Sequence, residues 1–228
     1  MKLVNKFRIS KNIIHYIFEN EEIKILIPFR ILIVFLWQIW KRTIALPIVL
    51  RLGNGMKYYA VPEASNSTGA VYVSTYERKY INFIRKNILK KESTWVDIGA
   101  NSGLFAIWFS DIFNKGYLFE PTPDLFNILE INIKINNLKG YRTLNKACSD
   151  SNKKLDLVIT GKLSGDNRIS DNRIIRRNEI LIKVDSLSID DLEIKNGIDF
   201  LKIDTKGSEL SFLKGAINPL KNSSHAIA

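Results

Sequence analysis

Apolar residues follow two alternating spacings from residue 94 onwards, one typical of strands and one typical of helices. Short apolar runs predict four strands, at 94–99, 117–121, 143–148 and 199–204. Between strands, apolar residues recur every three or four positions, as in Leu125, Ile128, Leu129 and Ile135, which predicts covering helices. Strands that alternate with helices indicate a parallel sheet, so the predicted fold class is α/β.

The first part of the chain has a different pattern. Residues 31–40 form an apolar run between Arg30 and Lys41, and its helical length of roughly 15 Å is too short to cross a bilayer core of about 30 Å. A turn at Gly53–Gly55 predicts a hairpin, and a helix is expected over 77–87. We therefore divide the chain into a helical segment, 1–45, and a main domain, 46–228.

Charge is concentrated in the N-terminal segment. The whole chain carries a formal charge of +11, and residues 1–60 hold ten basic and three acidic side chains. Two interpretations of residues 31–40 stay open: a helix buried against the main domain, or an interfacial helix that makes a peripheral membrane contact.

Composition narrows the chemistry. The single cysteine, Cys148, excludes an internal disulfide and favours a cytoplasmic location. The two histidines, His15 and His225, have no metal-ligand spacing, so we expect no metal.

The most informative motif is a Gly-rich turn between the first predicted strand and its helix. It contains Asp97, Gly99, Asn101, Ser102 and Gly103. Gly99 permits a tight bend, and Gly103 permits the helix that follows to pack close to the strand. Asn101 stands where glycine is common, and asparagine tolerates a left-handed backbone.

A second acid completes the motif. Glu120 ends the next strand, where a carboxylate can accept hydrogen bonds from a ribose diol. A dinucleotide would require G-x-G-x-x-G, whereas position 104 is Leu. Asp97 would repel a pyrophosphate and attract an ammonium group, so the turn favours S-adenosylmethionine (SAM) as the cofactor.

Four longer segments of the sequence resemble those of one protein family. WVDIGANSGLFAIWFS, LFEPTPDLFNILEINIKINNL, NKACSD and FLKIDTKGSELSFLKGA occur in the order and spacing of FkbM-family methyltransferases, which the chain resembles from about residue 50 to 220. The resemblance implies a Rossmann-like SAM methyltransferase sheet with helices on both faces. It also implies O-methylation of a hydroxyl on a sugar, glycan or secondary metabolite.

The same resemblance assigns roles to individual residues. Asp97, Gly99, Asn101 and Gly103 match the SAM loop, and Glu120 matches the ribose acid. Ser149 and Asp150 match a Ser-Asp pair near the adenine. Asp204 matches the acid at the tip of the fourth strand, and we expect Asp204 or Glu209 to be the catalytic base.

Two departures from the family pattern keep alternatives open. Lys206 replaces a carboxylate that the family usually carries, and the chain ends at Ala228, where a fifth strand at 224–228 would be forming. We therefore expect a sheet that is cut short after its fifth strand, and a truncated or inactive SAM-binding remnant is the alternative function. A nucleic-acid methyltransferase is the weaker alternative, and no nucleic-acid partner is expected, because IDTKGSE stands where a base-gripping motif would follow the fourth strand.

Overall fold

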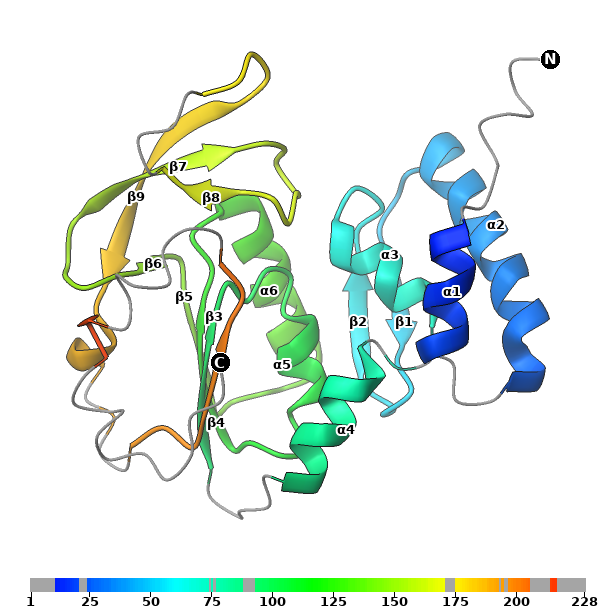
Figure 1. Ribbon diagram of the computed structural model, residues 1–228, viewed down its shortest axis with the longest axis horizontal. Coiled ribbons are helices and arrows are strands. Elements are labelled where there is room, and N and C mark those ends of the chain that lie inside the picture. Colours follow the sequence, from blue (N-terminus) through cyan, green and yellow to red (C-terminus); the bar gives the residue numbers. More distant parts are fainter. Residues whose placement is uncertain are drawn as a thin grey trace. The chain divides into compact units, whose positions relative to one another are not determined.

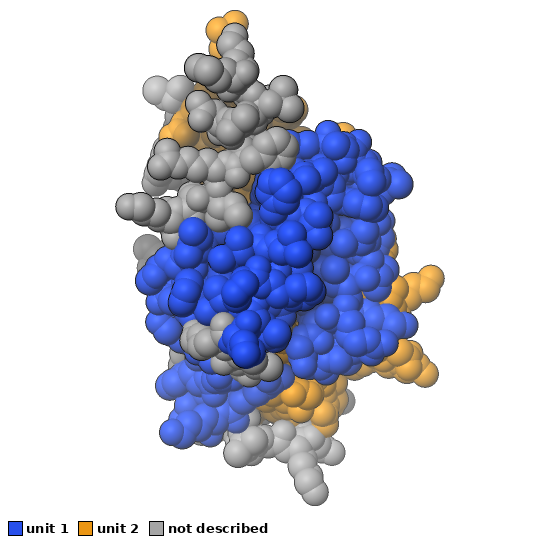
Figure 2. All heavy atoms as spheres, turned by 90° about the vertical axis from the view of Figure 1, so that its right-hand side faces the viewer, with its two compact units in different colours: residues 1–88 blue, residues 89–228 orange. Residues whose placement is uncertain are grey.

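The protein forms two compact units, residues 1–88 and 89–228, which Figure 2 shows in separate colours. The computed structural model describes residues 11–20, 24–73, 75, 77–87, 93–170, 175–192, 194, 197–205 and 214–216. The predicted boundary between residues 45 and 46 stays a prediction. The expected fifth strand at 224–228 lies outside the described residues.

The first unit combines helices with one hairpin (Figure 1). Its elements are α1 (Lys11–Asn20), η2 (Lys24–Leu26), α2 (Ile27–Thr43), β1 (Ile48–Arg51), β2 (Lys57–Ala60), α3 (Ser65–Tyr72) and α4 (Arg78–Asn87). The predicted hairpin is confirmed, because β1 and β2 pair antiparallel and Gly55 in their turn has φ 82°.

Helix α2 packs on α3 through polar and aromatic side chains. Trp37 is buried, and its Nε1 donates to Thr68 Oγ1 at 3.3 Å. The Gln38 amide donates to the Tyr72 hydroxyl. Residues 31–40 are therefore helical, as predicted, and the helix extends beyond them at both ends.

Helix α4 confirms the helix predicted over 77–87, with one correction. The apolar residues of this helix were expected to lie together on one side of it. Ile81 and Ile84 are buried, whereas Tyr80 and Phe83 are exposed. None of the described helices has both the length and the apolarity that crossing a membrane requires.

The second unit holds the predicted parallel sheet. Its elements are β3 (Thr94–Ile98), α5 (Leu104–Trp108), β4 (Lys115–Phe119), α6 (Pro123–Ile135), β5 (Tyr141–Leu144), β6 (Ala147–Cys148), β7 (Lys154–Ile159), β8 (Arg168–Ile169), β9 (Ile180–Leu187), η3 (Ile189–Asp191) and β10 (Phe200–Ile203). Strands pair in parallel in the order β10-β3-β4-β5. The α/β class is thereby confirmed.

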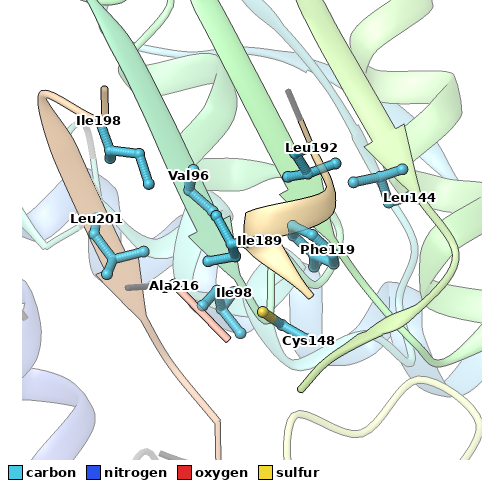
Figure 3. Packing of buried hydrophobic residues seen from close by; sticks show 10 residues of the cluster. All are labelled: Val96, Ile98, Phe119, Leu144, Cys148, Ile189, Leu192, Ile198, Leu201 and Ala216. Carbon is cyan, nitrogen blue, oxygen red and sulfur yellow. The ribbon is translucent and has the colours of Figure 1, made fainter. Parts of the chain in front are cut away.

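Apolar side chains cover both faces of this sheet. On one face, β-strand residues pack against η3 and the segment around Ala216, forming the cluster in Figure 3. On the other face, Trp95 packs against Phe109, Phe113 and Phe200 with ring centroids 5.2–6.4 Å apart. The sheet is therefore closely packed on both faces, and this packing supports the residues at the carboxyl ends of its strands.

A second sheet occupies the segment between β5 and β10, although no strand was predicted between residues 148 and 199. The strands are ordered β6-β9-β7-β8, with β7 antiparallel to both β8 and β9. The strand predicted at 143–148 is in fact divided, so that β5 joins the first sheet and β6 the second. The four predicted strands therefore leave out β7, β8 and β9.

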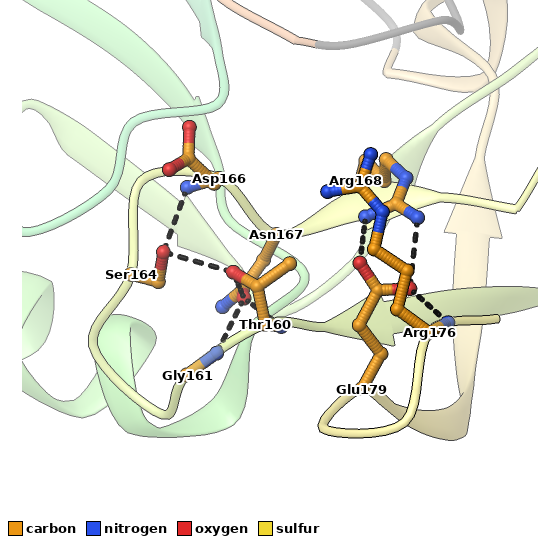
Figure 4. A network of polar contacts seen from close by, with 8 residues as sticks. All are labelled: Thr160, Gly161, Ser164, Asp166, Asn167, Arg168, Arg176 and Glu179. Atoms are coloured by element: carbon orange, nitrogen blue, oxygen red, sulfur yellow. Dashed lines mark hydrogen bonds and ion pairs between the residues drawn. The ribbon is translucent and has the colours of Figure 1, made fainter.

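Arginines of that segment support this second sheet. The Arg168 guanidinium on β8 donates to both carboxylate oxygens of Glu179, at 3.0 and 3.1 Å, and the Arg176 backbone N–H donates to the same carboxylate (Figure 4). Asn167 Oδ1 accepts the Thr160 N–H at 2.9 Å in the neighbouring turn. Arg168 is therefore part of a structural ion pair.

Candidate functional site

The candidate residues lie where the strand order reverses. From β3 the chain adds β4 and β5 on one side, and β10 returns to the other side of β3. In open parallel sheets, ligands bind at the carboxyl ends of strands at such a switch point. The turn after β3, the end of β4 and the end of β10 all meet there.

The turn after β3 depends on three left-handed residues. Gly99, Asn101 and Gly103 have φ values of 84°, 53° and 80°. The N–H groups of Gly99 and Ala100 both donate to the Phe119 carbonyl, at 3.0 and 2.8 Å. The predicted left-handed backbone at Asn101 is confirmed.

At two glycines the backbone lies so close to a neighbouring segment that a side chain would not fit. A Cβ on Gly99 would lie 2.3 Å from the Asp204 carbonyl oxygen, so this turn touches the end of β10. A Cβ on Gly103 would lie 2.6 Å from Cδ1 of Leu129, which places α6 against the start of α5. The close contact at Gly103 is therefore made with helix α6, and not with the strand as predicted.

Glu120 connects the end of β4 to this turn. Its side chain is buried, and Oε2 accepts the Asn101 N–H while Oε1 accepts the Thr122 N–H, both at 2.8 Å. Burial raises the pKa of Glu120 to about 7, although these hydrogen bonds act in the opposite direction. Each oxygen keeps a further lone pair, so acceptance from a ribose hydroxyl is compatible with this geometry.

Asp97 is the most deeply buried acid of the site. It is fully shielded from solvent on β3, and Lys202 Nζ of β10 donates to its Oδ1 at 3.0 Å. Burial raises the pKa of Asp97, and Lys202 acts against that shift. Asp97 Oδ2 is buried without a hydrogen-bond partner among the described residues.

Lys202 is a site residue to which sequence reasoning assigned no role. Its ammonium also lies 3.6 Å from Asp204 Oδ2 and 4.8 Å from the Phe105 ring centroid. A lysine two positions before the acidic tip of a strand was the available signal. Two carboxylates and one aromatic face therefore surround this ammonium.

Two asparagines were also missed, and both hold backbone of the site. Asn132 is buried on α6, and its Nδ2 donates to the Ser102 carbonyl at 2.8 Å. Asn145 Nδ2 donates to the Glu120 carbonyl at 2.9 Å. For Asn132, the only signal in the sequence was a polar residue within the apolar stripe of α6.

Ser149 and Asp150 follow β6. Ser149 is buried and its Oγ donates to Asp150 Oδ1 at 3.1 Å, whereas Asp150 is exposed. Hydrogen bonds from Lys153, Ser151 and Ser149 lower the pKa of Asp150 to about 2. This pair therefore presents an ionised carboxylate at the protein surface.

Of the two predicted catalytic acids, Asp204 lies within the described residues and Glu209 does not. Asp204 is exposed at the end of β10, and its N–H donates to the Ile98 carbonyl at 2.9 Å. Glu209 and Lys206 lie outside the described residues. Asp204 is therefore the acid whose position beside the turn is defined.

The family model described as the methyltransferase FkbM domain matches residues 97–226, more than half of the chain. The chain belongs to the FkbM methyltransferase family. The match begins at Asp97 and includes the Gly-rich turn, Glu120 and Asp204, so every candidate residue lies within the FkbM domain.

Relatives of this FkbM-family protein include the methyltransferase sdnD of Sordaria araneosa, 26% identical over 152 residues, 53% of this chain and 59% of that protein. The FkbM methyltransferase structure from Methylobacillus flagellatus aligns with a TM-score of 0.43 and 15% identity, over 92% of this chain and 44% of that one. The tRNA m1G37 methyltransferase of M. jannaschii aligns with a TM-score of 0.30 and 14% identity, covering 61% and 56%. The chain thus spans about three fifths of its curated relative.

Proposed function

We propose that this FkbM-family protein is a SAM-dependent methyltransferase that acts on a hydroxyl of a sugar, glycan or secondary metabolite. One observation carries the cofactor assignment: among the residues that the structure describes, none donates a hydrogen bond to the buried Oδ2 atom of Asp97, which lies at the switch point directly before a turn of left-handed residues. A buried carboxylate oxygen without a partner is costly, and an ammonium donor would relieve that cost.

The residues present fit the parts of SAM one by one. Asp97 would accept from the α-amino group, and the backbone of Gly99 to Gly103 would approach the ligand without side-chain obstruction. Glu120 would accept from the ribose hydroxyls, and Ser149 with Asp150 would contact the adenine. When bound, SAM supplies an activated methyl group on a sulfonium.

The chain's own contribution to transfer would be alignment and proton acceptance. An acceptor hydroxyl at the end of β10 would release its proton to the Asp204 carboxylate while its oxygen takes the methyl group. Lys202 Nζ lies 3.6 Å from Asp204 Oδ2, on the same side of the turn as this carboxylate. Glu209 stays a second candidate for this role.

The first experiment is a calorimetric titration with SAM. We expect Asp97→Asn to weaken binding at least about tenfold, since an amide cannot offer the ammonium a charged acceptor. Asp199→Asn is the matched control, because Asp199 lies at the opposite end of the same strand pair, where its carboxylate accepts the Thr94 N–H at 2.8 Å. Equal affinities for both variants would refute the cofactor site.

A second measurement separates binding from catalysis. Labelled methyl transfer to hydroxyl-bearing sugars should fall at least about a hundredfold in Asp204→Asn while its SAM affinity is unchanged. SAM binding by the intact chain without transfer to any hydroxyl acceptor would support the alternative of an inactive SAM-binding protein. Transfer to nucleic acid would support the second alternative.

A further inference from the structure

Helix α2 presents a stripe of apolar side chains to solvent. Ile25, in the turn that leads into the helix, is 85% exposed, and Phe29, Leu32 and Leu36 are 58%, 50% and 54% exposed. Their spacing of four, three and four residues places them on one helical face. We call these four residues the α2 stripe; from Ile25 to Leu36 it is about 16 Å long at 1.5 Å per residue.

The opposite face of α2 carries the polar groups. Lys41 Nζ donates to Thr68 Oγ1 at 3.1 Å, and burial lowers the pKa of Lys41. Gln38 and Trp37 also point their polar atoms toward α3. An ordinary surface helix has apolar side chains on its inner face alone, whereas α2 buries Ile27, Val34 and Trp37 and carries the exposed α2 stripe as well. An exposed apolar stripe of this kind marks an interaction site.

Charge identifies the kind of surface that would cover it. Besides Lys41, which contacts α3, residues 23–62 contain five cationic side chains, Lys24, Arg30, Arg42, Arg51 and Lys57, and no acidic one; Glu63 follows directly. A stretch of this composition is attracted to anionic lipid headgroups, each cation near the surface adding to the attraction. A second copy of the same face would bring like charges together, which disfavours self-association.

We propose that α2 lies in the plane of an anionic membrane surface, with the α2 stripe inserted between the headgroups. With 17 residues α2 is about 26 Å long, and it does not qualify as a membrane-crossing helix. An interfacial helix needs only an apolar face and nearby cations, and both are present here. The contact would hold the methyltransferase domain at a lipid surface, and it is independent of which cofactor or acceptor that domain uses.

The test is vesicle co-sedimentation of the full chain. We expect binding to vesicles of phosphatidylcholine and phosphatidylglycerol in equal parts, and at least about tenfold weaker binding to phosphatidylcholine alone. Phe29→Ser with Leu36→Ser should lower the partition coefficient at least about tenfold. The matched control is Phe83→Ser with Ile180→Ser, whose side chains are 53% and 64% exposed on other elements. This control should bind as the wild type does.

Three results would overturn the proposal. The first is equal binding by both double variants, because the stripe would then not be the contact. The second is a lower midpoint of thermal unfolding in Phe29→Ser with Leu36→Ser but not in the control, since that would mean another part of the chain covers the stripe. The third is a wild-type dimer that this variant converts to a monomer, because a second copy would then be the occupant.

Discussion

Lys202 and Asp97 are register partners on the parallel strands β10 and β3, and Lys202 Nζ lies 3.0 Å from Asp97 Oδ1. Both side chains are withdrawn from solvent, the carboxylate completely. Truncating one member of such a pair leaves a buried charge without compensation. This ion pair therefore connects the stability of the sheet to the chemistry of the site.

Lys202→Met should lower the free energy of unfolding of the second unit by about 3 kcal/mol, because Asp97 would be buried without its ammonium. Lys154→Met is the matched control, since Lys154 is also 3.0 Å from its partner Asp185 but both side chains are exposed. The control should change stability by about 1 kcal/mol or less. Urea unfolding of both variants checks this, and adding Asp97→Asn to Lys202→Met should restore part of the loss.

Glu120 should make the apo protein less stable as pH rises from about 5 to about 8. Its pKa is about 7 in the folded chain against 4.5 in the unfolded chain, so between these values the native state binds more protons. The free energy of unfolding then falls with pH, by up to about 3 kcal/mol from this group. Glu120→Gln removes the titration, and its curve should be flatter than the wild-type curve when unfolding is followed across this range. Parallel curves would contradict the assignment.

Gly99→Ala should destabilise the second unit more than Gly103→Ala does. Both positions have left-handed backbones, so the conformational cost is similar, about 1 kcal/mol. The new Cβ at Gly99 meets a backbone carbonyl, which cannot move without shifting β10, whereas at Gly103 it meets the end of the Leu129 side chain, which can rotate. We expect a difference of at least about 1 kcal/mol in urea unfolding. The opposite order would show that β10 yields more easily than α6.

Asn101→Gly should be tolerated, whereas Asn101→Ala should not. Glycine adopts φ 53° without strain and loses only the side-chain bond from the Ser102 N–H to Asn101 Oδ1, at 2.8 Å. Alanine loses the same bond and adds strain of about 1 kcal/mol. SAM affinity by calorimetry should therefore be close to wild type in the glycine variant and lower in the alanine variant. Equal losses would mean that the side-chain bond, and not the backbone angle, positions the turn.

The strands and helices between residues 94 and 135 could be predicted because their apolar residues recur at regular spacings and because elements that are neighbours in the sequence are also neighbours in the fold. The strand at Thr94–Ile98 is buried at every position, which is typical of a parallel strand covered on both faces. The turn residues were recognisable because glycine and asparagine are the residues that a left-handed backbone selects.

The second sheet was missed because its strands carry charges on one face. Lys154 and Asp185 pair across β7 and β9, and Asp156 pairs with Lys183, so these segments look polar in composition. Their alternation with Leu155, Leu157, Ile182 and Val184 is the strand signal. The contact of Lys202 with Asp97 was missed, because it depends on a register between strands 105 residues apart, which the position of the lysine near the strand end does not reveal.

That separation has a consequence for synthesis on the ribosome. Strand β3 is completed at Ile98, and one of its edges pairs with β4 soon after, but the other edge pairs only with β10. A nascent chain that has not reached residue 200 therefore displays an apolar strand edge together with a buried acid that lacks its cation. Such edges are the surfaces through which unfinished chains aggregate. The step that closes this edge is also the one that delivers Lys202 and Asp204, so the emerging polypeptide covers its open strand edge and receives the base that we propose for it in a single late event.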